Sequence, residues 1–168
     1  MRARSLLVAT LVIGVAGCAV PGAGSQAPGQ RQSQAPALTL TRVAGTPARR
    51  TDAAIAVAFD EASAAELISP LPAELDLATD ALLCVYLGER PTGGWGLALQ
   101  SAALRDGELR ILARETRPRG NVTQAVTYPG DCASVPRAAL PAGELAVRAD
   151  DTISDEFIVD GRIEVPRS

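Results

Sequence analysis

The chain of 168 residues contains no lysine and no histidine, so all sixteen of its basic residues are arginine. Without histidine the chain cannot hold a Ser-His-Asp triad, a Cys-His nucleophile pair or a His-ligated metal ion. The sequence also has no dinucleotide-binding or phosphate-binding loop motif. Any catalysis would depend on carboxylates, tyrosine, arginine or a thiol, and we expect neither a metal ion nor another cofactor.

Aromatic residues are scarce: there are two Phe, two Tyr and one Trp, against 31 alanines. The hydrophobic core must then be built from Leu, Val, Ile and Ala, and little ring surface remains for stacking against sugars. The net charge is only −3, and both signs are mixed along the chain. This balance excludes the clustered basic face that is typical of nucleic-acid-binding proteins.

The N-terminus has the pattern of a bacterial export signal. Arg2 and Arg4 precede an apolar run at 6–16, which is shorter than the roughly 20 residues of a membrane-spanning helix. The run ends in Val-Ala-Gly-Cys at 15–18, which resembles a lipobox, the motif whose cysteine receives a diacylglycerol and becomes the first mature residue. We therefore expect a signal peptide at 1–17, a lipid on Cys18, and a place in the cell envelope, anchored to a membrane and facing outside the cytoplasm.

The residues after the lipobox change composition before the body of the chain begins. Residues 18–37 are rich in Pro, Gly, Gln, Ser and Ala and have no apolar period. That composition is typical of a flexible tether. We expect one β-rich domain at 38–168.

Two cysteines remain once Cys18 is assigned to the lipid. An even number of cysteines in an exported domain indicates a disulfide, here between Cys84 and Cys132. Closing a loop of roughly 48 residues stabilises a fold by about 4 kcal/mol in the chain-entropy model. A zinc site and two free buried thiols are the alternatives, although two cysteines without histidine make a poor zinc site.

The hydrophobic pattern predicts a mainly β (or α+β) fold: a small, mostly antiparallel sheet domain, sandwich-like or barrel-like. Asp-Gly pairs at 106–107 and 160–161 predict hairpin turns. A short helix is expected at 61–68, where Ser63 and Glu66 have the spacing of a capping box. The strands are expected at 37–42, 53–59, 81–87, 95–104, 108–115, 122–128, 144–149, 156–159 and 162–165.

Residues 75–136 carry a set of turns that resembles a known family. The set consists of a strand closing at Gly88, a Thr-Gly-Gly-aromatic turn at 92–95, an Asp-Gly hairpin at 106–107 and a closing strand at 123–129. It resembles the C-terminal domain of the PrcB family, which is named for a subunit of a protease complex. The resemblance implies an accessory role in such a complex, and these domains often occur in bacterial lipoproteins.

The sequence departs from that family at three places. Trp95 stands where Tyr is usual, and Leu77 stands where an aromatic residue often follows the aspartate. The pair Cys84 and Cys132 does not belong to the family pattern.

The candidate binding residues lie in the 92–95 turn and at the end of the predicted 122–128 strand. The two glycines of the turn indicate positive φ or a close approach of another chain segment. Trp95 is either an anchor beneath its loop or a contact for a partner protein. The threonines have no nearby base, so we interpret them as strand residues rather than nucleophiles. The candidate binding residues are Thr92, Gly93, Gly94, Trp95, Thr127 and Tyr128.

Two clusters of charge allow two interpretations each. An acidic run near the C-terminus is either a solvated face or a Ca²⁺ site, although it lacks the spacing of an EF-hand. An arginine cluster around Pro118 is either an exposed loop or an anion-binding site. The acidic run is Asp150, Asp151, Asp155, Glu156 and Asp160, and the arginines are Arg114, Arg117 and Arg119.

These patterns together predict an envelope lipoprotein whose domain binds or stabilises another protein without catalysis. The partner would be an unidentified envelope protein, plausibly a protease, and the membrane would be reached only through the lipid on Cys18. A small ligand- or glycan-binding module and a carboxylate-dependent hydrolase are the alternatives. A shallow apolar patch near the 92–95 turn would favour protein binding, whereas two carboxylates facing across a cleft would favour an enzyme.

Overall fold

The computed structural model describes residues 36–154 and 156–167, and Cys18, the signal peptide and most of the tether lie outside this part of the chain. All the elements below belong to one compact unit. They are β1 (Ala37–Leu38), β2 (Thr41–Arg42), β3 (Thr46–Pro47), β4 (Ala53–Ala58), α1 (Glu61–Ala65), β5 (Ile68–Ser69), β6 (Asp80–Leu87), β7 (Gly96–Arg105), β8 (Glu108–Thr116), β9 (Gly130–Pro136), the 3₁₀ turn η1 (Arg137–Ala139), β10 (Gly143–Asp151) and β11 (Phe157–Val165).

The predicted β fold is confirmed, and it is a sandwich of two sheets. One sheet has five strands in the order β1-β7-β8-β10-β11, and the other has four in the order β2-β9-β6-β4. A two-stranded pair, β3-β5, forms a separate small sheet. Every pairing is antiparallel except that of β8 with β10, which is parallel. A parallel pair needs a long crossover, and here the crossover passes through β9 in the other sheet.

Strand β6 is central because both of its faces are buried. Its odd-numbered residues Ala81, Leu83 and Val85 pack in the core between the two sheets, together with apolar residues of β8 and β10. Its even-numbered residues Leu82 and Cys84 pack in a second core on the far side of the four-stranded sheet. Side chains alternate along a strand, so burial on both faces explains why this strand is a continuous apolar run.

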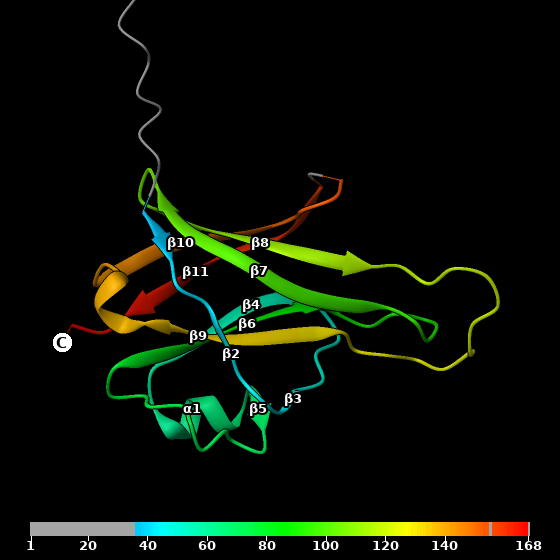
Figure 1. The fold of residues 1–168 in the computed structure, drawn as a ribbon, viewed down its shortest axis with the longest axis horizontal. Helices are drawn as coiled ribbons and strands as arrows, with labels where there is room; N and C mark the ends of the chain where they lie inside the picture. The colour runs from blue at the N-terminus through cyan, green and yellow to red at the C-terminus, as the bar shows by residue number, and fades with distance from the viewer. Residues whose placement is uncertain (1–35, 155, 168) are drawn as a thin grey trace, which may run out of the picture. The chain divides into compact units, whose positions relative to one another are not determined.

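The second core is covered by the segments between β2 and β6. Ala64 of α1 and Leu67, Ile68 and Leu77 from the following turns close over it. In Figure 1, α1, β3 and β5 lie on one side of the four-stranded sheet, and the five-stranded sheet lies on its other side. The arrangement is therefore three layers, with the four-stranded sheet in the middle.

The disulfide between Cys84 and Cys132 is confirmed. The two cysteines are direct partners in the antiparallel β6-β9 ladder, with their Cα atoms 4.2 Å apart. Both side chains lie in the second core. The bond thus joins neighbouring strands of one sheet rather than the two layers of the sandwich.

The predicted helix is present, but it is shorter and begins differently. It ends at Ala65, because Leu67 and Ile68 leave it to enter the second core and β5. Its N-cap is Asp60, whose side chain accepts a hydrogen bond from the backbone N–H of Ser63 at 2.9 Å. The expected capping box of Ser63 with Glu66 is therefore wrong, since Ser63 is the third residue of the helix and Asp60 is its N-cap.

The predicted strand at 122–128 is wrong, and a strand at 130–136 takes its place. Residues 122–126 have no strand partner, and only Thr127 forms an isolated bridge, with Arg90. Strand β9 begins after Pro129, and four successive residues of it, Cys132–Val135, are buried. Both faces of the strand are therefore buried there. Alternation therefore marked the wrong segment, because a doubly buried strand shows none.

Two other strand boundaries also differ from the prediction. Segment 37–42 is split into β1 and β2, which pair with different sheets. The predicted turn at 160–161 is wrong, because β11 runs unbroken through Gly161, which lies opposite Val147. The chain turns instead between β10 and β11. In the part of the chain that the structure describes, no helix has the length and apolar character needed to cross a membrane.

Candidate binding site

The loop before β7 is joined to the irregular segment before β9 by backbone hydrogen bonds. Arg90 and Thr127 exchange two bonds, with N–H to O distances of 2.8 and 2.9 Å, and the Gly93 N–H donates to the carbonyl of Thr123 at 2.9 Å. The Thr127 hydroxyl also donates to the carbonyl of Thr92 at 2.9 Å. The structure thus brings together the two segments that hold the predicted binding residues.

The glycine pair of this loop has the backbone role expected from the sequence. Gly94 has a φ of +85°, and a Cβ there would stand 3.1 Å from Cβ of Pro118. Gly93 is buried, and a Cβ there would overlap the hydroxyl of Thr123. Gly94 therefore provides the left-handed turn, and Gly93 permits the close approach of the second segment.

Trp95 supports the loop from within. Its side chain is half-buried but belongs to neither hydrophobic core. The indole N–H donates to the Thr92 hydroxyl at 3.2 Å, and the guanidinium of Arg90 lies 5.2 Å from the ring centroid. The ring thus links both ends of the turn and leaves part of its surface accessible.

Tyr128 stands at the other end of the joined segments. Its hydroxyl donates to the carboxylate of Glu89 at 3.2 Å, and the Arg49 guanidinium lies 5.9 Å from its ring. The hydrogen bond to the Glu89 carboxylate raises the pKa of Tyr128. The phenol therefore stays protonated and donates to Glu89 at neutral pH.

Segment 119–126 projects beyond the ends of the strands to which it is joined (Figure 1). All its residues except Val122 are exposed. Val126 is an apolar side chain with an exposed fraction of 52%. We call residues 88–95 and 119–128 together the paired-loop surface.

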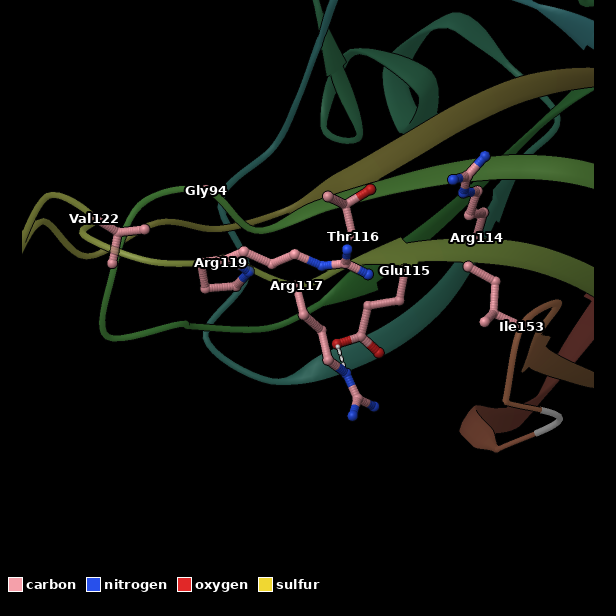
Figure 2. Close-up of a pocket in the computed structure, with 9 residues that line it drawn as sticks. Gly94, Arg114, Glu115, Thr116, Arg117, Arg119, Val122 and Ile153 are labelled. Carbon is pink, nitrogen blue, oxygen red and sulfur yellow. Dashed lines mark hydrogen bonds and ion pairs between the residues drawn. The ribbon is translucent and has the colours of Figure 1, made fainter.

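A hollow of about 480 Å³ borders this surface at the end of β8. We call it the arginine pocket, because Arg114, Arg117 and Arg119 line it together with Gly94 and Ile153. Figure 2 shows Arg114 and Thr116 pointing to one side of β8 and Glu115 to the other, while Arg119 folds back from the following turn toward the strand. Arg114 therefore lies within the strand predicted at 108–115, and only Arg117 and Arg119 of the arginine cluster lie in an exposed loop.

The three arginines differ in their partners. Arg117 is bonded to the carboxylates of Glu115 at 3.3 Å and Glu156 at 2.7 Å. These carboxylates raise the pKa of Arg117, the bond to Glu156 contributing most. Among the residues that the structure describes, no carboxylate forms an ion pair with Arg114 or Arg119.

Asp151 is buried, so the acidic run is not simply a solvated face. Its carboxylate accepts bonds from the backbone N–H of Glu115 at 2.9 Å and from the N–H and hydroxyl of Ser154 at 3.0 and 2.8 Å. These bonds lower the pKa of Asp151 to about 2, and the bond from the backbone N–H of Glu115 contributes most. Asp155 lies outside the described residues.

A smaller hollow of about 170 Å³ adjoins the arginine pocket and has both Glu115 and Asp151 in its lining. Both carboxylates are bonded within the fold, Glu115 to Arg117 and Asp151 to the turn after β10. Within residues 36–154 and 156–167, no group of three or more acidic or cysteine side chains is placed to hold a metal ion.

The sequence did not predict several residues of this region as part of a site. Glu89 and Arg90 form contacts within the joined segments, and Thr123, interpreted as a strand residue, contacts Gly93; nothing in a single sequence marks such contacts. Ile153 gave a signal that could have been used: it is a lone large apolar residue in an acidic turn, and its exposed fraction is 68%. A side chain of that kind is a frequent contact for a partner.

Comparison with known proteins supports the resemblance and extends it no further. No curated protein and no solved structure matches the chain. A match to one known family does exist, and it covers β9 and nearly all of β6, with β7, β8 and the joined loops between them. Residues 82–136 match the family described as PrcB C-terminal.

Proposed function

We propose that this chain is a lipid-anchored module of the bacterial envelope that binds another protein through its paired-loop surface and does not catalyse a reaction. The family match at 82–136 supports an association with a protease complex. The lipobox at 15–18 supports anchoring through Cys18. The partner would be a protein outside the cytoplasm that the domain holds or stabilises.

The observation that carries this proposal is the rigid presentation of exposed residues. Three backbone hydrogen bonds fix the 88–95 loop against 123–127, while Val126 on the same segment stays 52% exposed. A loop that is fixed before binding loses little conformational entropy when a partner docks. Exposed apolar groups on such a loop are then available for contact.

The state of the acidic residues supports a role without catalysis. A general acid needs a carboxyl group whose pKa is raised toward the working pH. The pKa of Asp151 is instead lowered to about 2. Asp131 is also engaged, because it accepts a hydrogen bond from the backbone N–H of Leu99 at 2.8 Å. Both carboxylates hold the backbone in place.

Site-specific photocrosslinking in the native envelope tests the binding role. A photoreactive residue would replace Val126 in the full, lipidated chain, and a matched one would replace Arg105, which is exposed at the opposite end of β7. We expect one protein to be crosslinked at position 126 and not at 105. Equal crosslinking at both positions, or none at 126, would contradict the proposal.

Lipid anchoring is tested separately by labelling cells with a radioactive fatty acid. We expect the label on the wild-type chain and none on a Cys18→Ala variant, which should also leave the membrane fraction. A Cys18→Ala chain that is labelled equally and stays membrane-bound would show that the anchor is wrong, whatever the crosslinking result.

A further inference from the structure

Strand β8 continues past the strand that pairs with it on one side. Its parallel register with β10 ends at Ala113 opposite Asp151, but β8 itself continues to Thr116. After Asp151 the chain turns away from β8, and the N–H of Thr152 makes the last bond between the two backbones, to the carbonyl of Ala113 at 2.8 Å. Residues 114–116 therefore form a short sheet edge on that side.

The direction of the backbone groups along this edge follows from strand alternation. The carbonyl of Ala113 and the N–H of Glu115 both point to the β10 side, because they bond to Thr152 and Asp151 there. The carbonyl of Glu115 points to the same side. No described strand continues alongside it, so it can accept a hydrogen bond from an added chain.

The arginine pocket lies along this edge and supplies charge. Arg114 and Arg119 line it and have no ion-pair partner among the described residues. A guanidinium binds a carboxylate through two parallel hydrogen bonds. Ile153, exposed by 68%, adds an apolar contact at the rim. Residues 114–116 of the edge, Arg119 and Ile153 thus all line one hollow of about 480 Å³.

We propose that the arginine pocket binds an extended acidic segment of the partner protein, which adds alongside residues 114–116 and places a carboxylate between Arg114 and Arg119. This inference rests on the proposed function, since it names the chemistry of the segment that the module binds. The charge is complementary, because Arg114 and Arg119 are positive and form no ion pair with the described residues, whereas the segment is negative. A peptide is favoured over a lipid headgroup, because only a peptide can use the sheet edge.

The test uses the full chain and a defined probe. The probe is a capped hexapeptide of alternating glutamate and valine, and its matched control carries glutamine in place of glutamate. Binding is followed by fluorescence anisotropy at low ionic strength, with Arg114→Gln and Arg119→Gln variants. The control variant is Arg105→Gln, which removes the same charge at the far end of β7.

We expect the glutamate peptide to bind, the glutamine peptide to bind at least about tenfold more weakly, and each pocket variant to lose at least about tenfold. Arg105→Gln should bind like the wild type. Added salt should weaken binding. Equal binding of both peptides, or an equal loss in Arg105→Gln, would overturn the proposal.

A second readout separates strand addition from simple charge attraction. On binding, the ¹³C resonance of the Glu115 carbonyl should move downfield, and a peptide with N-methylated backbone amides should bind more weakly. No movement of that resonance would show that the edge is unused. Binding to phosphatidylglycerol vesicles that equals or exceeds binding to the peptide would overturn the peptide assignment in favour of a lipid surface.

The two proposals fail in different ways. If Val126 crosslinks one protein but Arg114→Gln and Arg119→Gln leave that crosslink unchanged, the binding role stands and the acidic-segment inference is wrong. If no protein is crosslinked at Val126 and the hexapeptide does not bind, both are wrong.

Discussion

The buried carboxylate of Asp151 accepts a hydrogen bond from the backbone N–H of Glu115, 2.9 Å away, where the parallel pairing of β8 and β10 ends. The same carboxylate holds the turn that follows β10 through Ser154. One side chain therefore satisfies the N–H of Glu115 beyond the end of the ladder and fixes the turn that carries Ile153 to the rim of the arginine pocket.

Replacing this carboxylate should destabilise the domain. Asp151→Ala leaves the N–H of Glu115 and the amide of Ser154 without their acceptor, so the free energy of unfolding should fall by about 2 kcal/mol. Asp160→Ala, which removes an exposed acid from β11, should change it by less than about 0.5 kcal/mol. Urea unfolding of the two variants measures the difference. Equal effects would show that the buried bonds of Asp151 do not stabilise the fold.

The stabilisation by Asp151 should depend on pH. The pKa of Asp151 is lowered from 3.8 to about 2 in the folded chain, so protons bind more tightly to the unfolded state. The contribution is then complete above the unfolded pKa and is lost as the pH falls through the folded value. We expect the stability gap between wild type and Asp151→Asn to be constant near neutral pH and to narrow below about pH 4. A gap that is independent of pH would contradict the lowered pKa.

Gly130 should not tolerate a side chain. It lies directly opposite Tyr86 in the β6-β9 ladder, and a Cβ there would stand 2.8 Å from Cδ1 of the Tyr86 ring. Tyr86 cannot easily move, because its buried hydroxyl donates to the carbonyl of Leu67 at 2.9 Å. Gly130→Val should lower the free energy of unfolding by about 2 kcal/mol or more.

Gly161→Val is the matched control for that substitution. Gly161 also lies within a strand, but its Cβ would meet only Val147, at an ordinary 3.8 Å. We expect this variant to stay within about 1 kcal/mol of the wild type in the same unfolding experiment. Similar losses at both glycines would mean that strand entropy, rather than the Tyr86 ring, decides the effect.

Reducing the disulfide should lower stability without changing the fold. Cys84 and Cys132 are separated by 48 residues in the chain, and opening such a loop costs about 4 kcal/mol in the chain-entropy model. The midpoint of urea unfolding should therefore fall when a reductant is added to the wild type. A Cys84→Ala/Cys132→Ala variant should show no response to the reductant. A response of equal size in that variant would exclude the disulfide as its cause.

The sequence predicted most strands because alternation and turn residues act locally. The Asp-Gly turn at 106–107 forms where expected: Asp106 has a φ of 54° and Gly107 one of 80°. The continuous apolar run at 81–87 correctly marked the central strand. Each of these features depends only on residues that are neighbours in the chain.

The errors arose where partners distant in the chain decide the outcome. The alternation at 122–128 is real, but only Thr127 forms a β-bridge there. Gly161 lies in a strand because β10 runs beside it, whereas Asp-Gly alone indicates a turn. The candidate site follows the same rule: the 92–95 turn was visible in the sequence, whereas its bonds to Thr123 and the burial of Asp151 depend on tertiary structure.

The central claim is that the paired-loop surface binds the partner, and the most direct test is the affinity of the full chain for the protein crosslinked at Val126. Calorimetric titration would compare the wild type with Val126→Asp and with Ala142→Asp, which adds the same charge at an exposed residue just before β10. We expect Val126→Asp to stay folded and to bind at least about tenfold more weakly, and Ala142→Asp to bind as the wild type does. Undiminished binding by a folded Val126→Asp chain would contradict the account.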